Sequence, residues 1–300
     1  MRIGLALGGG GLTGTAFHAG VLTALADHFD AREADVIVGT SAGSTAAALM
    51  RSGFPPRDYV ARVAGLPMSA EGEAILGSMP PLSDPGPPAR RRRAPASADL
   101  ARAVARRPWR YRPGVALSAL LPAGTRPVDP GARRLRALFD GWPEKPTWIV
   151  AVDLRTGRRV AFGRDAHADV GDAVAASCAV PGYFEPVAIG GRDYVDGGAY
   201  SMLSLDLLAD QDLDVVIVSA PLSTSDWLAA DPGNAPRAAM RAQLEREARK
   251  VRASGTRIVA VQPDAALRRI MGTNSMVVAK RAPVALATRE YATRVFRREL

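Results

Sequence analysis

Two short apolar runs near the N-terminus each end in a glycine-centred turn that leads directly into a helical pattern. The first run is RIGLAL at 2–7, and the second is DVIVG at 35–39. Runs that are apolar throughout, rather than alternating with polar residues, are typical of strands buried on both faces of a sheet. Strands that alternate with helices predict a mostly parallel sheet with helices on both sides. We therefore expect an α/β fold with three layers (α/β/α) around a mostly parallel central sheet.

The same alternation returns after residue 146. A Gly-Gly pair at Gly190 and Gly191 separates VAI from RDYV, and it predicts a hairpin, because a two-residue turn needs positive φ angles. Further strands are predicted at 147–154, 158–163, 214–219 and 257–262, and helices at 14–28, 44–54, 169–179, 236–254 and from about 283 to the last residue.

The region 67–146 has a different composition, with dense prolines and glycines, clustered arginines and only short helical stretches. We interpret it as an Arg/Pro-rich insertion or cap outside the sheet. The chain of 300 residues is then a single domain, 1–300, in which 220–300 is a C-terminal helical extension.

Cysteine and histidine are scarce. Cys178 is the only cysteine, which excludes an intramolecular disulfide and a Cys-based zinc site and fits a reducing compartment, so we expect a cytoplasmic protein. With three histidines we expect no metal site, and nothing calls for an organic cofactor. No apolar run reaches the roughly 18 residues of a membrane-spanning helix. The glycine-rich start reads as folded structure and not as a signal peptide.

The formal charge of +9 is concentrated at 86–112, which holds nine arginines and one aspartate. Such a segment attracts phosphate, either of a nucleic acid or of an anionic membrane surface. No RRM, zinc-finger or helix-turn-helix pattern is present, so we favour peripheral contact with an anionic membrane. Trp109 and Tyr111 within the segment fit insertion into a membrane interface and packing inside the cap equally well.

Three glycine-centred segments carry the chemistry. In the first, which follows the first strand and opens a helix, Gly9, Gly11 and Gly14 form G-x-G-x-x-G. Backbone N–H groups at such a helix start hold an anion, either a pyrophosphate or the oxyanion of an acyl-transfer intermediate.

The second segment is G-x-S-x-G, formed by Gly39, Ser41 and Gly43 between a strand and a helix. This is the context of a nucleophile elbow, which presents the serine hydroxyl at the carboxyl edge of the sheet. In the third, Asp196 is followed by Gly197 and Gly198 at the end of the hairpin strand, where small neighbours leave the carboxylate accessible.

The histidines favour a serine–aspartate dyad over a triad. A triad of the α/β-hydrolase order needs a histidine downstream of the serine, and His167 is the only one there, in a polar loop. His18 lies near the glycine loop, where packing is the simpler interpretation, and His28 lies on the same predicted helix. An aspartate in direct contact with the serine can act as base if burial raises its pKa.

In these features the chain resembles the patatin-like phospholipases, which carry a GGGG-type loop, a GxSxG serine and a DGG or DGA aspartate in this order. The segment from Ser177 to Pro186 also resembles the family's S-x-A-x-P-x-x-F-x-P pattern. The resemblance implies a modified α/β-hydrolase fold, with Ser41 as nucleophile and Asp196 as its partner. It also implies an oxyanion hole of the amides around Gly9, Gly10 and Gly11. The chain departs from the family pattern at Thr13, where Arg or Lys is usual, and at Met202 and Ser204, near a usual Asn and Pro.

We therefore expect a serine lipid acyl hydrolase that cleaves esters of phospholipids or related lipids through an acyl-enzyme. A non-phospholipid esterase or thioesterase would use the same dyad. A dinucleotide-binding Rossmann protein would need an acidic residue after the second strand, where the sequence reads Gly39-Thr40-Ser41.

Overall fold

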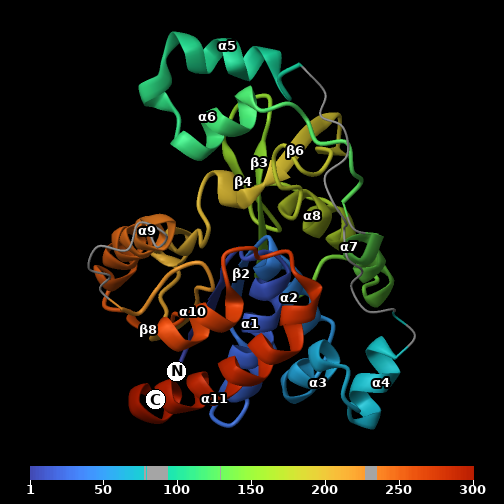
Figure 1. Ribbon diagram of the computed structural model, residues 1–300, viewed down its shortest axis with the longest axis vertical. Helices are drawn as coiled ribbons and strands as arrows, with labels where there is room; N and C mark the ends of the chain where they lie inside the picture. The colour runs from blue at the N-terminus through green and yellow to red at the C-terminus, as the bar shows by residue number, and fades with distance from the viewer. Residues whose placement is uncertain (78, 80–93, 129, 227–234) are drawn as a thin grey trace.

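The computed structural model describes residues 1–77, 79, 94–128, 130–226 and 235–300 (Figure 1). The strands, in chain order, are β1 (Ile3–Leu7), β2 (Val36–Thr40), β3 (Thr147–Asp153), β4 (Arg159–Phe162), β5 (Val187–Ile189), β6 (Arg192–Asp196), β7 (Val215–Ser219) and β8 (Arg257–Val261). The α-helices are α1 (Gly11–Leu25), α2 (Ala42–Arg51), α3 (Tyr59–Ala64), α4 (Ala70–Leu76), α5 (Ala98–Arg106), α6 (Pro113–Leu120), α7 (Pro130–Arg134), α8 (Val170–Ser177), α9 (Ala235–Arg252), α10 (Ala265–Met271) and α11 (Arg281–Glu299). Short 3-10 turns are η1 (Ala31–Glu33), η2 (Pro56–Asp58), η3 (Pro108–Arg110), η4 (Leu135–Leu138), η5 (Gly197–Ala199), η6 (Leu205–Leu208) and η8 (Val278–Lys280).

The eight strands form one mixed sheet in the order β5-β6-β3-β2-β1-β7-β8, with β4 also paired to β3. The pairs from β3 through β2, β1 and β7 to β8 are parallel, whereas β4, β6 and β5 add antiparallel pairs beyond β3. The parallel centre confirms the predicted α/β sheet. The β5–β6 turn confirms the predicted hairpin, since φ is 56° at Gly190 and 73° at Gly191.

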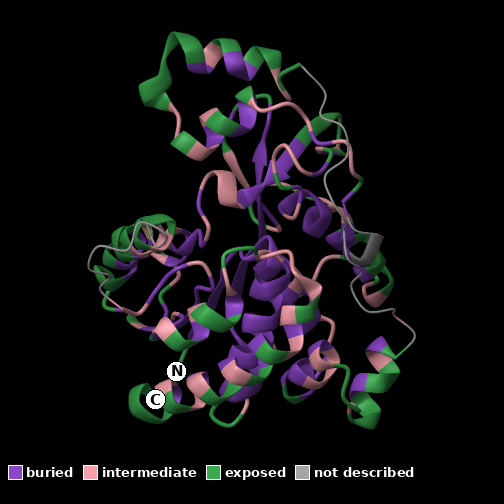
Figure 2. Ribbon diagram, in the orientation of Figure 1, coloured by how far each residue is buried: buried purple, intermediate pink, exposed green. Residues whose placement is uncertain are grey.

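Successive residues of the central strands pack into two different cores, one on each face of the sheet. Leu5 and Leu7 join the core that includes residues of α1, α2 and α11, whereas Ala6 joins the core that includes residues of α9. This explains why β1 is apolar throughout, because both of its faces are buried (Figure 2).

The described part of 67–146 contributes helices and 3-10 turns, and none of its residues belongs to a strand. Helices α5 and α6 lie at one end of the molecule, above β3 and β6 (Figure 1). The four arginines at 90–93, part of the basic segment, lie outside the described residues. In the C-terminal stretch, β8 extends the sheet and α11 packs along α1. No helix in the described ranges is long and apolar enough to cross a membrane.

Two predicted helix boundaries were wrong by a few residues. Helix α1 ends at Leu25 and not at His28, because the N–H groups of Asp27 and His28 bond to carbonyls three residues back, which tightens the helix into a turn. It also starts earlier, at Gly11, although Gly14 makes the first N–H bond to Gly10. Helix α11 begins before Pro283, which is tolerated in a first helical turn.

Candidate active site

Ser41 occupies a sharp turn between β2 and α2. Its φ of 53° lies in the left-handed region, which is strained for a residue with a side chain. The glycines on either side permit the turn: a Cβ on Gly39 would lie 2.6 Å from the Gly43 carbonyl oxygen, and one on Gly43 only 1.9 Å from the Leu7 carbonyl oxygen. The G-x-S-x-G spacing therefore has a steric origin, as expected for a nucleophile elbow.

The backbone around Ser41 is held by Ser177, at the end of α8. The Ser41 N–H donates to the Ser177 hydroxyl at 2.8 Å, and that hydroxyl donates to the carbonyl of Val150 in β3 at 2.6 Å. Ser44 donates back to the Ser41 carbonyl at 2.6 Å. Reasoning from the sequence gave Ser177 no role of its own, although it opens the segment that resembles the family pattern.

Asp196 is the last residue of β6 and pairs with Ala151 of the neighbouring β3. Its carboxylate accepts the Gly198 N–H at 2.7 Å, and a Cβ on Gly197 would lie 2.4 Å from the Val150 carbonyl oxygen, so the turn after Asp196 is packed against β3. Only 5% of Asp196 is exposed.

Burial raises the pKa of Asp196 from its ordinary value of 3.8 to about 6, while hydrogen bonds from the Gly198 N–H and the Ser41 hydroxyl act in the opposite direction. The site therefore joins a serine on a strained turn to a carboxylate whose pKa lies close to neutrality. This is the pairing that a two-residue proton transfer requires.

The glycine loop lies against Ser41. A Cβ on Gly9 would lie 3.5 Å from the Cβ of Ser41, and one on Gly14 would lie 3.4 Å from the Cβ of Ala42. The Gly9 N–H, however, donates to the Met202 carbonyl at 2.8 Å. The expectation that the Gly9 amide serves an oxyanion is therefore corrected, because that donor is already used inside the protein.

The amides of Gly10, Gly11 and Leu12 donate to no atom of the described residues. They stand at the start of α1, where unpaired N–H groups and the helix dipole favour a negative charge. Gly10 and Gly11 were predicted from the sequence, whereas Leu12 was missed because an amide donor leaves no side-chain signal.

The departures from the family pattern are built into the loop contacts. Thr13 is 1% exposed, and its N–H donates to the Ser275 carbonyl at 3.0 Å. Met202 supplies the carbonyl that holds Gly9, and its Sδ would be 2.7 Å from a Cβ on Gly198. Ser204 adopts a left-handed φ of 49°.

His18 is buried beneath the glycine loop. Its Nε2 lies 2.7 Å from the Gly8 carbonyl oxygen, which can only accept, so Nε2 carries the proton and Nδ1 accepts from the Ser219 hydroxyl at 2.7 Å. Burial lowers the pKa of His18 to about 4, against the Gly8 hydrogen bond, and keeps the imidazole neutral. His18 thus ties α1 to the loop and to β7. The two other histidines, His28 and His167, are exposed outside the cavity described below.

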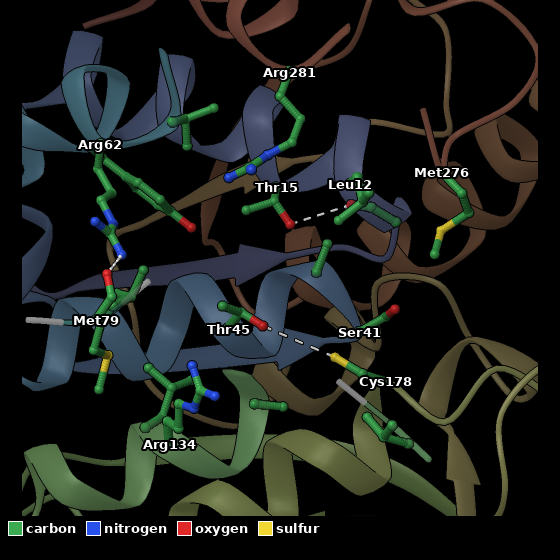
Figure 3. Close-up of a pocket in the computed structure, with 18 of the residues that line it drawn as sticks. Leu12, Thr15, Ser41, Thr45, Arg62, Met79, Arg134, Cys178, Met276 and Arg281 are labelled. Carbon is green, nitrogen blue, oxygen red and sulfur yellow. Dashed lines mark hydrogen bonds between the residues drawn. The ribbon is translucent and has the colours of Figure 1, made fainter. Parts of the chain in front are cut away.

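A cavity of about 150 Å³ opens beside Ser41 (Figure 3). Most of its wall is apolar, and α2 runs along it from Ser41 through Thr45 to Leu49, a length of about 12 Å at 1.5 Å per residue. The apolar side chains come from several helices and turns, namely Leu12, Leu49, Val63, Leu76, Val128, Leu135, Val180 and Phe184. Such a wall suits a hydrocarbon chain.

Arginines are the only charged residues among those that line the cavity. They are Arg62, Arg134 and Arg281 (Figure 3), and the buried Tyr59 lies on the same wall as Arg62. Burial raises the pKa of Tyr59, although the charge of Arg281 lowers it somewhat, so the phenol is neutral.

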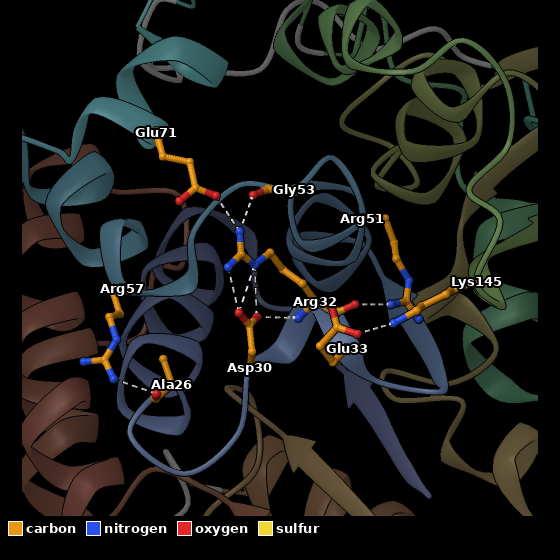
Figure 4. Close-up of polar contacts among 9 residues, drawn as sticks. All are labelled: Ala26, Asp30, Arg32, Glu33, Arg51, Gly53, Arg57, Glu71 and Lys145. Carbon is orange, nitrogen blue, oxygen red and sulfur yellow. Dashed lines mark hydrogen bonds and ion pairs between the residues drawn. The ribbon is translucent and has the colours of Figure 1, made fainter.

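The α3–α4 side of the cavity is connected to the sheet by a polar cluster (Figure 4). Arg32, just before β2, donates to Glu71 of α4 at 2.6 Å, to the Gly53 carbonyl at 2.9 Å and to Asp30 at 2.8 Å. One guanidinium therefore links the entry to β2, the end of α2 and the start of α4, and so fixes one wall relative to Ser41.

Within the described ranges, no group of three or more His, Cys, Asp or Glu side chains is arranged to hold a metal ion. Asp153, at the end of β3, accepts the Arg155 and Thr156 N–H groups at 2.7 and 3.2 Å and pairs with Arg192 at 2.9 Å. It therefore stabilises a turn.

Comparison with known proteins gives one family and two similar solved structures. The family model described as patatin-like phospholipase matches residues 5–209. VipD from Legionella pneumophila is 14% identical, with a TM-score of 0.44 over 98% of this chain and 66% of that chain. The type III effector protein ExoU is 15% identical, with a TM-score of 0.38 over 99% of this chain and 53% of that chain. The present chain thus spans less than two thirds of the length of either.

Proposed function

Because this chain belongs to the patatin-like phospholipase family, we propose that it is a lipid acyl hydrolase in which Ser41 is the nucleophile and Asp196 is the base. The observation that supports this most is the raised pKa of Asp196, about 6, in contact with the hydroxyl of a serine whose φ is 53°. A carboxylate with this pKa is ionised at neutral pH yet basic enough to take a proton from serine.

The reaction follows from these positions. Asp196 accepts the proton as the Ser41 Oγ attacks the ester carbonyl, and the negative charge on the carbonyl oxygen is stabilised by the N–H groups of Gly10 and Gly11 at the start of α1. Collapse of this intermediate breaks the ester bond, and the alcohol leaves with the proton from Asp196. Water then attacks the acyl-enzyme, gives its proton to Asp196 and releases the carboxylic acid, which restores Ser41.

The substrate class follows from the cavity. A largely apolar wall that begins at Ser41 favours an ester whose acyl part is a hydrocarbon chain, as in phospholipids and related lipids. A non-phospholipid ester or a thioester would use the same nucleophile and base. Hydrolysis of phospholipid vesicles, compared with that of simple acyl esters and acyl thioesters, separates these substrates.

The nucleophile is tested with a fluorophosphonate probe. We expect the wild type to be labelled and Ser41→Ala to be unlabelled and to lose ester hydrolysis by more than about a thousandfold. Ser254→Ala is the matched control, because Ser254 is exposed and lies after α9. Labelling of Ser41→Ala at the wild-type rate, or hydrolysis within tenfold of wild type, rejects the proposal.

A further inference from the structure

Helix α5, turn η3 and helix α6 form a lobe at one end of the molecule, residues 98–120, which we call the α5–α6 lobe (Figure 1). Much of its surface is exposed (Figure 2). Trp109 is 79% exposed, Leu117 56% and Leu120 53%. Leu117 and Leu120 are three residues apart and share one side of α6, away from the buried Val115. Large apolar side chains gathered on one exposed surface indicate a binding site.

The same lobe is strongly basic. Its sequence holds five arginines and one acidic residue, Asp99. Arg102 pairs with Asp99 at 2.7 Å. Arg106, Arg107 and Arg110 are exposed and form no ion pair with any described residue. The apolar surface is therefore bordered by positive charge.

We propose that the α5–α6 lobe docks on an anionic lipid surface. Trp109, Leu117 and Leu120 enter the interface between headgroups and acyl chains, where tryptophan is favoured, and the arginines attract the headgroups. A nucleic acid would satisfy the arginines but would leave the two leucines exposed to water. The identification of a lipid partner rests on the proposed function, because the lipid surface is also where the substrate resides.

The lobe is attached to the segment that follows Asp196. Arg112 donates to the Tyr200 carbonyl at 3.0 Å, and its guanidinium carbon lies 4.1 Å from the centre of the Tyr200 ring. A Cβ on Gly114 would lie 2.4 Å from the Ala199 carbonyl oxygen, so α6 packs directly on η5. Docking of the lobe therefore brings lipid next to the loop that carries the base.

The lobe has a core of its own, so its surface can be changed without unfolding it. Leu100, Val104 and Val115 pack with Val152 of β3 and Val195 of β6. None of the exposed apolar side chains or the three unpaired arginines belongs to this core.

The test uses sedimentation of the whole protein with vesicles of phosphatidylcholine, with or without phosphatidylserine. Trp109→Ser/Leu117→Ser/Leu120→Ser and Arg106→Ser/Arg107→Ser/Arg110→Ser should each bind the anionic vesicles about tenfold or more weakly than wild type. Added salt should weaken wild-type binding and bring it close to that of the arginine variant. The control Leu66→Ser/Leu286→Ser removes apolar side chains that are 51% and 43% exposed elsewhere, and it should bind like wild type.

A second measurement does not depend on how the triple variants fold. In the wild type, a quencher carried on the lipid acyl chains should reduce tryptophan fluorescence, and this part of the quenching should disappear in Trp109→Phe. Equal quenching in both proteins overturns the proposal, as does wild-type affinity of the apolar triple variant. Competition of duplex DNA with vesicles, through the arginines alone, overturns it in favour of a nucleic acid.

Hydrolysis of a soluble ester keeps the two proposals separate. All lobe variants should retain wild-type turnover, because the lobe surface does not touch Ser41. Loss of vesicle binding with intact turnover supports the docking surface. Hydrolysis that survives Ser41→Ala rejects the proposed function and leaves the vesicle result to be judged by itself.

Discussion

Replacement of Asp196 by asparagine should abolish activity and at the same time stabilise the protein at neutral and alkaline pH. The carboxylate is 5% exposed, and its pKa in the folded protein is raised from 3.8 to about 6, chiefly by burial. Asparagine has nearly the same shape and can accept the Gly198 N–H in the same way, but it carries no charge. The variant therefore removes the base and the buried charge together.

The sign and size of the effect follow from proton linkage. Between pH 3.8 and about 6, the folded protein holds a proton that the unfolded chain has already released. Protonation thus favours the folded state, and the free energy of unfolding falls as pH rises through this window. A shift of about two units at about 1.4 kcal/mol each corresponds to about 3 kcal/mol. Asp196→Asn should be more stable than wild type by about this amount above pH 7, and the difference should vanish near pH 4.

The measurement is urea unfolding of both proteins at a series of pH values, together with kcat/KM for one soluble ester. The wild-type kcat/KM should increase about tenfold per pH unit below about 6 and level off above it, whereas the variant should lose a factor of about 100 to 10,000. Asp210→Asn, which removes the same charge from an exposed position, controls for net charge and should change neither quantity. A variant that is no more stable than wild type at pH 8, or a difference that does not depend on pH, refutes the reasoning.

Two further predictions concern the turn and the cavity. Gly43→Ala would place a Cβ 1.9 Å from the Leu7 carbonyl oxygen and should yield little folded protein by circular dichroism, whereas Gly141→Ala, with nothing within 4 Å, should fold like wild type. Val180, 37% exposed and on the cavity wall, can take a larger side chain, so Val180→Trp should lower kcat/KM about tenfold or more for long-chain esters and leave acetyl esters unaffected. Equal losses for both chain lengths would show that the cavity does not hold the acyl chain.

The features that the sequence predicts well are those in which a short stretch of chain determines its own geometry. The Gly39–Gly43 turn needs glycine at both ends because the neighbouring backbone lies too close for a side chain, and the Gly190–Gly191 turn needs two positive φ angles. The central strands are apolar on both faces because helices cover both. In each case the physical requirement is visible in the residue types themselves.

The remaining features depend on groups that are distant in sequence. The Gly9 amide is used by the carbonyl of Met202, and the elbow is held by Ser177, two contacts that no local pattern indicates. The cavity is similarly assembled from helices spread between Gly11 and Arg281. Whether an amide is available or a wall is apolar depends on how the chain packs, so residue types alone could not predict either one.

Asp196 joins the two kinds of information. The DGG pattern marks the residue, but its ability to act as a base comes from burial between β3 and the segment that carries Met202. The same segment holds Gly9 and, through Tyr200 and Ala199, supports α6. A change in how the α5–α6 lobe sits would therefore act on the base, through its burial, and on the glycine loop, through Met202. For this reason the turnover of a soluble ester by the lobe variants, with and without anionic vesicles, is the measurement in which coupling between lipid docking and catalysis would appear.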